Sequence, residues 1–349
     1  MPVRDDVEGP IAFARARVFD GEDFHDDWTV VVDGARIAAA GPGVEPPPGA
    51  HVVAREGVTL TPGLIDTHVH LGLHLPSLVL ASGVTTVRDL GWPLDRVAAL
   101  QHQDGPRVLF AGPMLTAPRG YPTRASWAPK GTGREVDHRT ARAAVAELAE
   151  AGACVIKVAQ EPRAGPLLAH GTLEVIAEEA RKHGLGVASH VGSLEQLDLA
   201  IEAGVTELAH GLWSDEEIPD ETLRLMDAAG VTLIPTLHIH PHPARIDAVA
   251  RYHAIGGRIV YGTDMGNEPI PPGFDVEEAT LMLDAGMSTA DVLRAATSAA
   301  ADLLGLPDAG RIRAGARADV ALFNGDASAD LRALGRPIVV LRAGAMVLA

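Results

Sequence analysis

The feature that most constrains the fold is a regular alternation between about residue 58 and residue 304, where short apolar runs alternate with amphipathic, alanine-rich segments. The apolar runs are, in chain order, VTLTPGLIDTHVH, GVTTVRDL, PRVLFAG, ACVIKVA, GLGVASH, VTELAH, GVTLIPTL and GRIVYGTD. Segments between them, such as RTARAAVAELAEAGA and GTLEVIAEEARKHG, have apolar residues at helical spacing and end at or near a glycine, as helices commonly do. Eight strand–helix units of this total length predict a (β/α)₈ TIM barrel. A doubly wound open sheet is the alternative, but no glycine-rich phosphate turn follows the first run.

Both ends of the chain have a different character. Residues 1–57 and 309–349 are strand-like and contain turn sequences such as DGED, VDGARI and GPGVEPPPGA. The termini of a compact domain usually lie close together, so the two pieces are expected to form one small composite β-sandwich domain beside a catalytic barrel of residues 58–308. If the two terminal pieces folded independently of each other, each would be too small to have a core of its own.

Charge and composition narrow the class of partner. The formal net charge of −17 argues against nucleic acid or an anionic membrane. No apolar run reaches the ~18 residues needed to span a bilayer, and the first residues, MPVRDDVEGPIAF, lack the order of a signal peptide. The single cysteine excludes an internal disulfide and a thiolate metal cluster. These features predict a cytoplasmic protein; the net charge says little about the substrate, because a local pocket can oppose the overall charge.

Titratable residues stand at the ends of the apolar runs, where a barrel of this kind carries its chemistry. They are His68, His70, Lys157, His190, His210 and Asp264. Any one has an ordinary explanation: a His-x-His pair can bind a metal, stabilise a charge or lie solvated at a strand end. Asp264 can cap a helix, or it can bind a metal through one oxygen while the other accepts a proton. Their joint placement predicts a site over the mouth of the barrel.

Lys157 is the most informative of these residues, because the chain has only three lysines and otherwise uses arginine. It lies in the apolar run ACVIKVA, where an ammonium group is costly to bury. One interpretation is a lysine that reaches a strand end or pairs with a carboxylate. The other is a neutral amine that reacts with carbon dioxide to form a carbamate, whose two oxygens bridge two metal ions. Arginine cannot do this because it stays protonated, which favours the second interpretation.

Eight stretches carry a family resemblance that covers nearly the whole chain. They are TPGLIDTHVHL, ASGVTTVRDLG, GPRVLFAGP, VIKV, IEAGVTELAHG, LIPTLHI, YGTDMG and AGARADVALFNGD. In sequence and order they resemble the amidohydrolase superfamily, and within it the imidazolonepropionase-like and prolidase-like hydrolases. The resemblance implies two divalent metal ions, usually zinc. It assigns His68, His70 and Asp264 to the more buried ion, His190 and His210 to the second, and carboxylated Lys157 with a hydroxide as the bridges.

The same resemblance implies hydrolysis of a C–N bond in a dipeptide, an N-acyl amino acid or a cyclic amide. Asp264 would accept a proton from the attacking water and pass it to the leaving group. A lactone or ester hydrolase with the same two ions is the nearest alternative, and a ring deaminase is a further one. The complete set of ligands argues against a non-catalytic, metal-bearing scaffold.

Four residues are candidates for contacts with the substrate. The long segment PMLTAPRGYPTRASWAPKGTGRE has four basic residues before its first acid, so Arg119 or Arg124 is expected to bind a substrate carboxylate, unless this is simply a solvated basic loop. Tyr121 stands where many members of the resembled family have a histidine. His238 lies nearest to the end of its strand in LHIHPHPAR. The connection after His70 is short, which predicts an open pocket or one completed by another subunit of a homo-oligomer.

Overall fold

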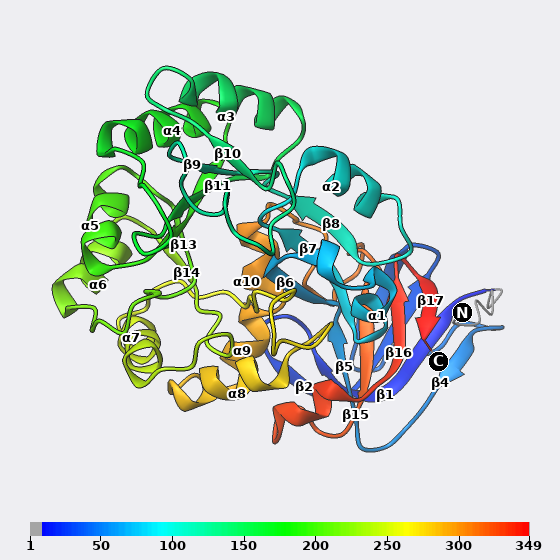
Figure 1. Cartoon of the computed structure of the whole chain (residues 1–349). Helices are drawn as coiled ribbons and strands as arrows, with labels where there is room; N and C mark the ends of the chain where they lie inside the picture. The colour runs from blue at the N-terminus through cyan, green and yellow to red at the C-terminus, as the bar shows by residue number, and fades with distance from the viewer. Residues whose placement is uncertain (1–8, 349) are drawn as a thin grey trace.

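The computed structural model describes residues 9–348. Residues 1–8 and 349, which belong to the predicted flanking domain, lie outside this range. The described chain has an α/β fold, with strands gathered in two regions and most helices on the outside of one of them (Figure 1).

One region is an eight-stranded sheet built from both ends of the chain, in the order β17-β16-β15-β5-β1-β2-β3, with β4 paired to β1. Its strands are β1 (Ile11–Phe19), β2 (Phe24–Asp33), β3 (Arg36–Gly41), β4 (His51–Val53), β5 (Val58–Pro62), β15 (Val320–Asn324), β16 (Pro337–Arg342) and β17 (Ala345–Leu348). Apolar side chains from both terminal segments, among them Phe13, Leu60, Val320 and Leu341, pack in one cluster. The two pieces therefore share a single core.

The other region contains two parallel sheets, β6-β7-β8 and β10-β9-β11-β12-β13-β14. Their strands are β6 (Leu64–Val69), β7 (Val84–Asp89), β8 (Arg107–Phe110), β9 (Met114–Thr116), β10 (Gly133–Glu135), β11 (Val155–Gln160), β12 (Gly186–Val191), β13 (Glu207–Ala209) and β14 (Thr232–Ile234). β9 and β10 are short and arise within the long segment that the sequence indicated only as a loop.

The first apolar run is divided between the two regions at Gly63. The part before it is β5, which pairs with β15 and β1 in the flanking sheet, and the part after it is β6. A Cβ atom at position 63 would lie 2.1 Å from Thr85 Oγ1. Only glycine fits where the backbone passes this close to β7.

Seven of the eight apolar runs form strands, and the eighth, residues 257–264, makes only isolated bridges. Its backbone bonds to β14 at one end, where the Val260 amide donates to Leu233 (3.1 Å). At the other end it bonds to β6, where the Asp264 amide donates to His68 (2.8 Å). Because its partner changes along its length, no regular ladder forms. On the other side, the amide of Cys154, just before β11, donates to Phe110 of β8 (2.9 Å). Backbone hydrogen bonds therefore join the two sheets both through residues 257–264 and between β8 and the start of β11.

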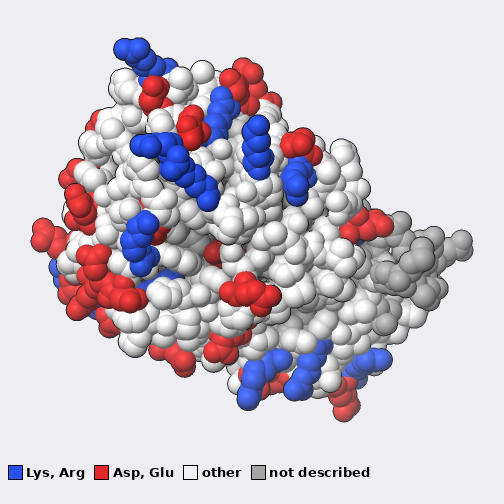
Figure 2. Space-filling view, viewed as in Figure 1, with Lys and Arg blue, Asp and Glu red and all other residues white. Residues whose placement is uncertain are grey.

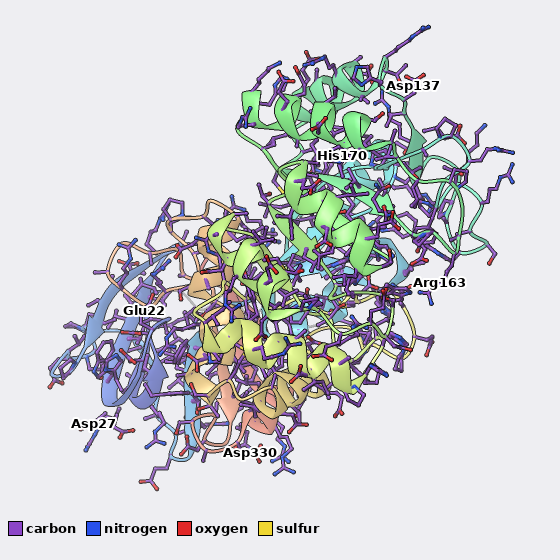
Figure 3. The ribbon with its side chains drawn as sticks, turned by 90° about the vertical axis from the view of Figure 1, so that its left-hand side faces the viewer. Glu22, Asp27, Asp137, Arg163, His170 and Asp330 are labelled. Atoms are coloured by element: carbon purple, nitrogen blue, oxygen red, sulfur yellow. The ribbon has the colours of Figure 1, made fainter. Side chains whose placement is uncertain are left out.

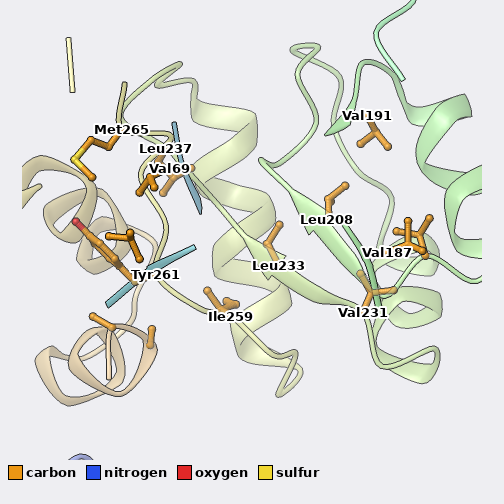
Figure 4. Packing of buried hydrophobic residues seen from close by; sticks show 14 of the residues in the cluster. Val69, Val187, Val191, Leu208, Val231, Leu233, Leu237, Ile259, Tyr261 and Met265 are labelled. Atoms are coloured by element: carbon orange, nitrogen blue, oxygen red, sulfur yellow. The ribbon is translucent and has the colours of Figure 1, made fainter. Parts of the chain in front are cut away.

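The helices follow the strands and cover their outer side (Figure 1). They are α1 (Pro76–Ala81), α2 (Leu94–Gln101), α3 (Ala141–Glu150), α4 (His170–Lys182), α5 (Leu194–Glu202), α6 (Asp220–Ala228), α7 (Pro243–Ala254), α8 (Val276–Asp284), α9 (Thr289–Ala295) and α10 (Ser298–Leu303), with 3₁₀ turns η1 (Leu71–Leu73) and η2 (Leu331–Gly335). Each longer helix buries one stripe; in α4 it comprises Leu173, Ile176 and Ala180, three or four residues apart. Figure 4 shows part of the resulting core, in which Val187, Leu208 and Leu233 of successive strands lie side by side.

Charged groups are unevenly distributed over the face in Figure 2. Acidic side chains gather along the edge that carries α5 and α6, whereas basic ones lie over the region of α2, α3 and the loop between β9 and β10 and, in a second group, along the lower edge of the view. Within residues 9–348, no helix is long and apolar enough to cross a membrane.

Candidate metal centre

His68 and His70 lie at the end of β6, with almost no exposed surface. The residues of β6 are fully buried, so the strand delivers both imidazoles into the interior. Burial lowers the pKa of His68 well below its ordinary value, and the nearby charge of Lys157 lowers it further. A neutral imidazole retains the lone pair that metal binding requires.

Asp264 is held beside these histidines by the backbone of β6. Its amide donates to the His68 carbonyl, and buried Asp66 accepts hydrogen bonds from the amides of His68 and Thr263 and from the Thr263 hydroxyl. Asp264 has a φ of 61°, a left-handed conformation that aspartate tolerates better than most residues. Gly266 follows, and a Cβ there would lie 2.7 Å from the His70 carbonyl oxygen. The chain is therefore folded tightly against the two histidines.

The geometry of the three side chains fits a metal ion. One ligand atom from each of His68, His70 and Asp264 lies within 4.8 Å of the others. Asp264 Oδ1 is 3.3 Å from His68 Nε2 and 3.2 Å from His70 Nε2. Both nitrogens of His68 and the Oδ1 atom have no hydrogen-bond partner in the described chain, although buried polar groups normally have one. A divalent cation would satisfy Asp264 Oδ1 and His68 Nε2, the nitrogen that lies next to it.

His190 and His210 form a second pair next to the first. The His210 ring lies 4.5 Å from that of His68 and 5.0 Å from that of His190, measured between centroids. Each has one nitrogen engaged: His190 Nε2 with Glu161 Oε2 (3.1 Å) and His210 Nδ1 with the Thr236 hydroxyl (2.9 Å). Such contacts fix the ring orientation and leave the other nitrogen for a ligand.

Lys157 lies among these groups, with an exposed fraction of 1% and no partner for its amine within residues 9–348. The sequence placed it at the end of its strand, but it lies within β11, which continues to Gln160. Burial lowers the pKa of Lys157 to about 7, against the opposing effect of Asp264. A substantial fraction of the amine is then neutral at physiological pH. Neutral amine is the form that reacts with carbon dioxide.

These groups open into a cavity of about 610 Å³. Its walls are formed by His70, Met114, Tyr121, Trp127, Lys157, Glu161, Arg163, Ala164, His190, His210, Trp213, Ile239, Asp264, Asn267 and Glu268. The volume is in the range of small-molecule sites, and ligand-type side chains form its floor. Figure 3 shows Arg163 on the side of the molecule away from Glu22 and Asp27 of the flanking sheet.

Residues 59–347 match the family model described as Amidohydrolase family. The chain belongs to this family. Its members generally use divalent metals, and membership supports a metal-dependent hydrolase that acts on C–N bonds.

Individual amidohydrolase relatives agree with this placement. An uncharacterised protein of Mycobacterium tuberculosis is 31% identical over 318 residues, which cover 79% of this chain and 81% of the relative. An adenine deaminase of Klebsiella pneumoniae is 27% identical over 84% of this chain, which spans only 49% of that enzyme. Among solved structures, a putative prolidase from Bifidobacterium longum is 27% identical, with a TM-score of 0.81 over 97% of this chain and 95% of the other. A Xaa-Pro dipeptidase is 22% identical and shares the fold, with a TM-score of 0.84 over 97% and 99%.

Of the four residues predicted to contact the substrate, one lines the cavity and three do not. Tyr121 lines the cavity, and burial raises its pKa, so its phenol stays protonated. His238 is not among the lining residues; its Nδ1 pairs with Asp275 Oδ2 (2.6 Å). Arg119 and Arg124 are exposed and also lie outside the lining set.

Nine lining residues were not singled out from the sequence, among them the polar and aromatic side chains of Glu161, Arg163, Trp127 and Trp213. Glu161 and Arg163 directly follow β11, so their position after the Lys157 strand was an available signal. Arg163 donates to Glu161 Oε1 (3.1 Å) and to the Trp213 carbonyl (3.3 Å). Trp127 and Trp213 lie in irregular loops, where no periodicity indicates the direction of a side chain.

Part of the backbone strain in the described chain lies at the centre. Among residues 9–348, seven non-glycine residues have positive φ, and three of them are His210, Thr236 and Asp264. The φ of Thr236 is 42°, which is unusual for a β-branched residue. Strained conformations cluster at functional sites, where the surrounding structure holds them in place.

Proposed function

We propose that this amidohydrolase cleaves a C–N bond in a dipeptide, an N-acyl amino acid or a cyclic amide, using two divalent metal ions. The observation that carries the proposal is the buried, unpartnered Lys157 amine, surrounded by His68, His190, His210 and Asp264. A structural lysine would have a carboxylate or carbonyl partner in such a place, since an unpaired buried ammonium is costly.

The proposed assignment of ligands is the one that the family resemblance implies, and the grouping of His68, His70 and Asp264 supports it. His68, His70 and Asp264 would hold one ion, and His190 with His210 the second. Lys157, as its carbamate, would supply oxygens to both. Zinc is the expected metal, because imidazole and carboxylate ligands suit it. When bound, the ions would polarise the scissile carbonyl and lower the pKa of water towards ~7.

The chain's own residues would perform the remaining steps. Asp264, whose Oδ1 points at His68 and His70, would accept a proton from the attacking water and return it to the leaving nitrogen. Tyr121 would donate a hydrogen bond from its protonated phenol to a substrate oxygen. Loops at the cavity walls would exclude bulk water from the reacting bond.

Deamination of a ring is the second candidate, supported by the match to adenine deaminases. Hydrolysis of a lactone or ester is a third, since the same centre would attack its carbonyl. In each case the substrate is a small molecule and the expected location is the cytoplasm.

We also infer that the strands of the two parallel sheets, with residues 257–264, form a (β/α)₈ barrel. The backbone hydrogen bonds that join the two sheets at two places support this inference. The flanking sheet would then be a separate composite domain, with its first boundary at Gly63 rather than at residue 58.

The deciding experiment is the metal content per chain of freshly purified wild type, Lys157→Ala and the surface control Lys182→Ala. We expect two metals in wild type and in Lys182→Ala, and a sharp fall in Lys157→Ala. About one metal in all three proteins would contradict the binuclear site. The same preparations are then assayed with dipeptides, N-acyl amino acids, cyclic amides, lactones and adenine. Turnover of only the last two groups would contradict amide hydrolysis.

A further inference from the structure

Seven aromatic and imidazole rings form a closed circuit around the candidate metal centre. In order, the ring centroids of His68, His70, Trp127, Tyr121, His190, Trp213 and His210 lie between 4.5 and 6.2 Å from the next, and His210 closes back onto His68. Four of the seven are candidate ligands. The other three, Trp127, Tyr121 and Trp213, belong to no metal assignment.

These three rings are unusual in a chain with few aromatic residues. The sequence has four tryptophans, three tyrosines and six phenylalanines, yet two tryptophans and one tyrosine line the same cavity. No phenylalanine lines it. All three side chains are only partly buried, so part of their surface faces the cavity rather than the protein core. Packing of the core alone does not account for them.

The rings come from two separate walls. Tyr121 and Trp127 belong to the segment between β9 and β10 and lie 6.2 Å apart. Trp213 belongs to the segment between β13 and α6, and the buried Arg245 guanidinium lies over its ring at 5.5 Å. Ring contacts between the walls pass through His190, which is 5.8 Å from Tyr121 and 5.4 Å from Trp213.

From this arrangement we infer that the cavity recognises a substrate with a planar aromatic ring, held against Trp127 and Tyr121 on one wall and Trp213 on the other. The inference rests on the proposed function for the reaction, but it concerns a different property of the site, namely the shape and electronic character of the group bound. Aromatic pairs gain from offset or edge-to-face contact beyond the area they bury. A saturated ring of the same size would bury similar area without that gain.

Binding of matched ligand pairs tests the inference without turnover. Metal-depleted protein is titrated by calorimetry with N-benzoylglycine and N-cyclohexanecarbonylglycine, which place the ring on the acyl side. N-acetylphenylalanine and N-acetylcyclohexylalanine place it on the amine side. We expect the aromatic member of at least one pair to bind about 2- to 10-fold more tightly. Equal or weaker binding of the aromatic member in both pairs would overturn the inference.

Substitutions of the two tryptophans show which rings cause the tighter binding of aromatic ligands. Trp127→Leu should abolish it and Trp127→Phe should retain it, because only the second keeps a ring. Trp28→Leu is the control, since Trp28 lies on β2 of the flanking sheet. Circular dichroism checks that each variant is folded. An unchanged preference in both Trp127→Leu and Trp213→Leu would overturn the inference.

Activity separates this result from the proposed function. Metal-loaded wild type is assayed with the same four compounds and with simple dipeptides. Aromatic preference in binding with no hydrolysis of any amide would refute the proposed reaction and leave the aromatic site standing. Hydrolysis with equal kcat/KM for the aromatic and the cyclohexyl substrates, together with equal binding of both, would refute the aromatic site and leave the proposed reaction standing.

Discussion

Arg88 of β7 and Glu207 of β13 form a buried, two-pronged ion pair between strands that do not neighbour each other in a sheet. Arg88 Nη1 is 3.1 Å from Glu207 Oε1, Nη2 bonds to Oε2, and Nε donates to the Thr67 carbonyl (2.9 Å). The pair therefore joins β6, β7 and β13 beneath the candidate metal centre. Burial is the largest influence on the pKa of Lys157 and lowers it; the two members of the pair have smaller, opposing effects, since Arg88 lowers this pKa and Glu207 raises it.

Breaking this pair on one side should destabilise the fold strongly. Glu207→Leu leaves the Arg88 charge buried and uncompensated, which costs about 3–5 kcal/mol of the free energy of unfolding. The double variant Arg88→Met/Glu207→Leu should recover most of this loss, because no charge remains buried. Urea unfolding measures the free energy of unfolding of the single and the double variant. Lys182→Met, which removes an exposed pair with Glu178, should cost under ~1 kcal/mol. A double variant as unstable as the single one would contradict this account.

The sequence was most informative where side-chain direction follows from regular structure. The sequence selected six residues because they were expected to end strands, and the structure brings their side chains together, although Lys157 lies within β11: His68, His70, Lys157, His190, His210 and Asp264. Their roles as ligands remain predictions. The amphipathic segments were equally clear, and those quoted from the sequence correspond to α3 and α4.

The sequence was less informative where the chain is irregular. The basic residues Arg119 and Arg124 were evident as charge, but the loop geometry that turns them to solvent was not. Nor did the apolar run before His68 reveal that Gly63 divides it between two sheets. The segment 257–264 reads as a strand, yet it changes partner midway, a tertiary effect that no local pattern encodes.

Asp264→Asn should remove catalysis while leaving the fold intact. The amide keeps the shape of the side chain but cannot accept a proton, so kcat should fall by at least ~10²-fold. Metal content should also fall, because Asp264 Oδ1 lies next to His68 and His70. Steady-state kinetics and metal analysis check both effects, with the exposed Asp284→Asn as control. Wild-type rates in Asp264→Asn would exclude Asp264 as the proton acceptor.

Glu161 should act on metal binding through His190. Although burial raises its pKa, hydrogen bonds from His190 and Arg163 lower the pKa of Glu161 to about 2, so it is a carboxylate at working pH. Accepting the proton on His190 Nε2 would leave Nδ1 free for a metal. Glu161→Ala should therefore weaken metal affinity about 10- to 100-fold, and Glu161→Gln less, since an amide oxygen still accepts. Competition with a chelator measures this, and Glu174→Ala on the exposed face of α4 should behave as wild type. Unchanged affinity in Glu161→Ala would make the contact incidental.

Glu278 should make the fold less stable as pH rises. It is fully buried on α8, and burial raises its pKa from 4.5 to about 8 despite hydrogen bonds from the backbone that lower it. Below about pH 4.5 both folded and unfolded chains hold the proton. Between about pH 4.5 and 8 only the folded chain does, so unfolding releases a proton and becomes easier with increasing pH. At 1.36 kcal/mol for each pH unit, the loss is at most about 5 kcal/mol. Unfolding of Glu278→Gln should depend less on pH over this interval, whereas the exposed neighbour Glu277→Gln should keep the wild-type dependence.

Arg163 is the arginine among the cavity-lining residues, and we expect it to bind a carboxylate on the substrate. Its guanidinium already contacts Glu161 Oε1 and the Trp213 carbonyl, so it is oriented at the rim, although its side chain is 62% exposed. A hydrogen bond to a charged group contributes about 1.5–3 kcal/mol when well buried, and solvent screening at this exposure should reduce the effect to roughly a 10-fold rise in KM. Arg163→Gln should show that rise for substrates with a carboxylate and none for their amidated counterparts, with kcat little changed. Arg119→Gln and Arg124→Gln are matched controls, because both arginines are exposed and outside the lining set. If KM rises in either control and not in Arg163→Gln, the loop between β9 and β10 moves over bound substrate and carries the carboxylate contact instead.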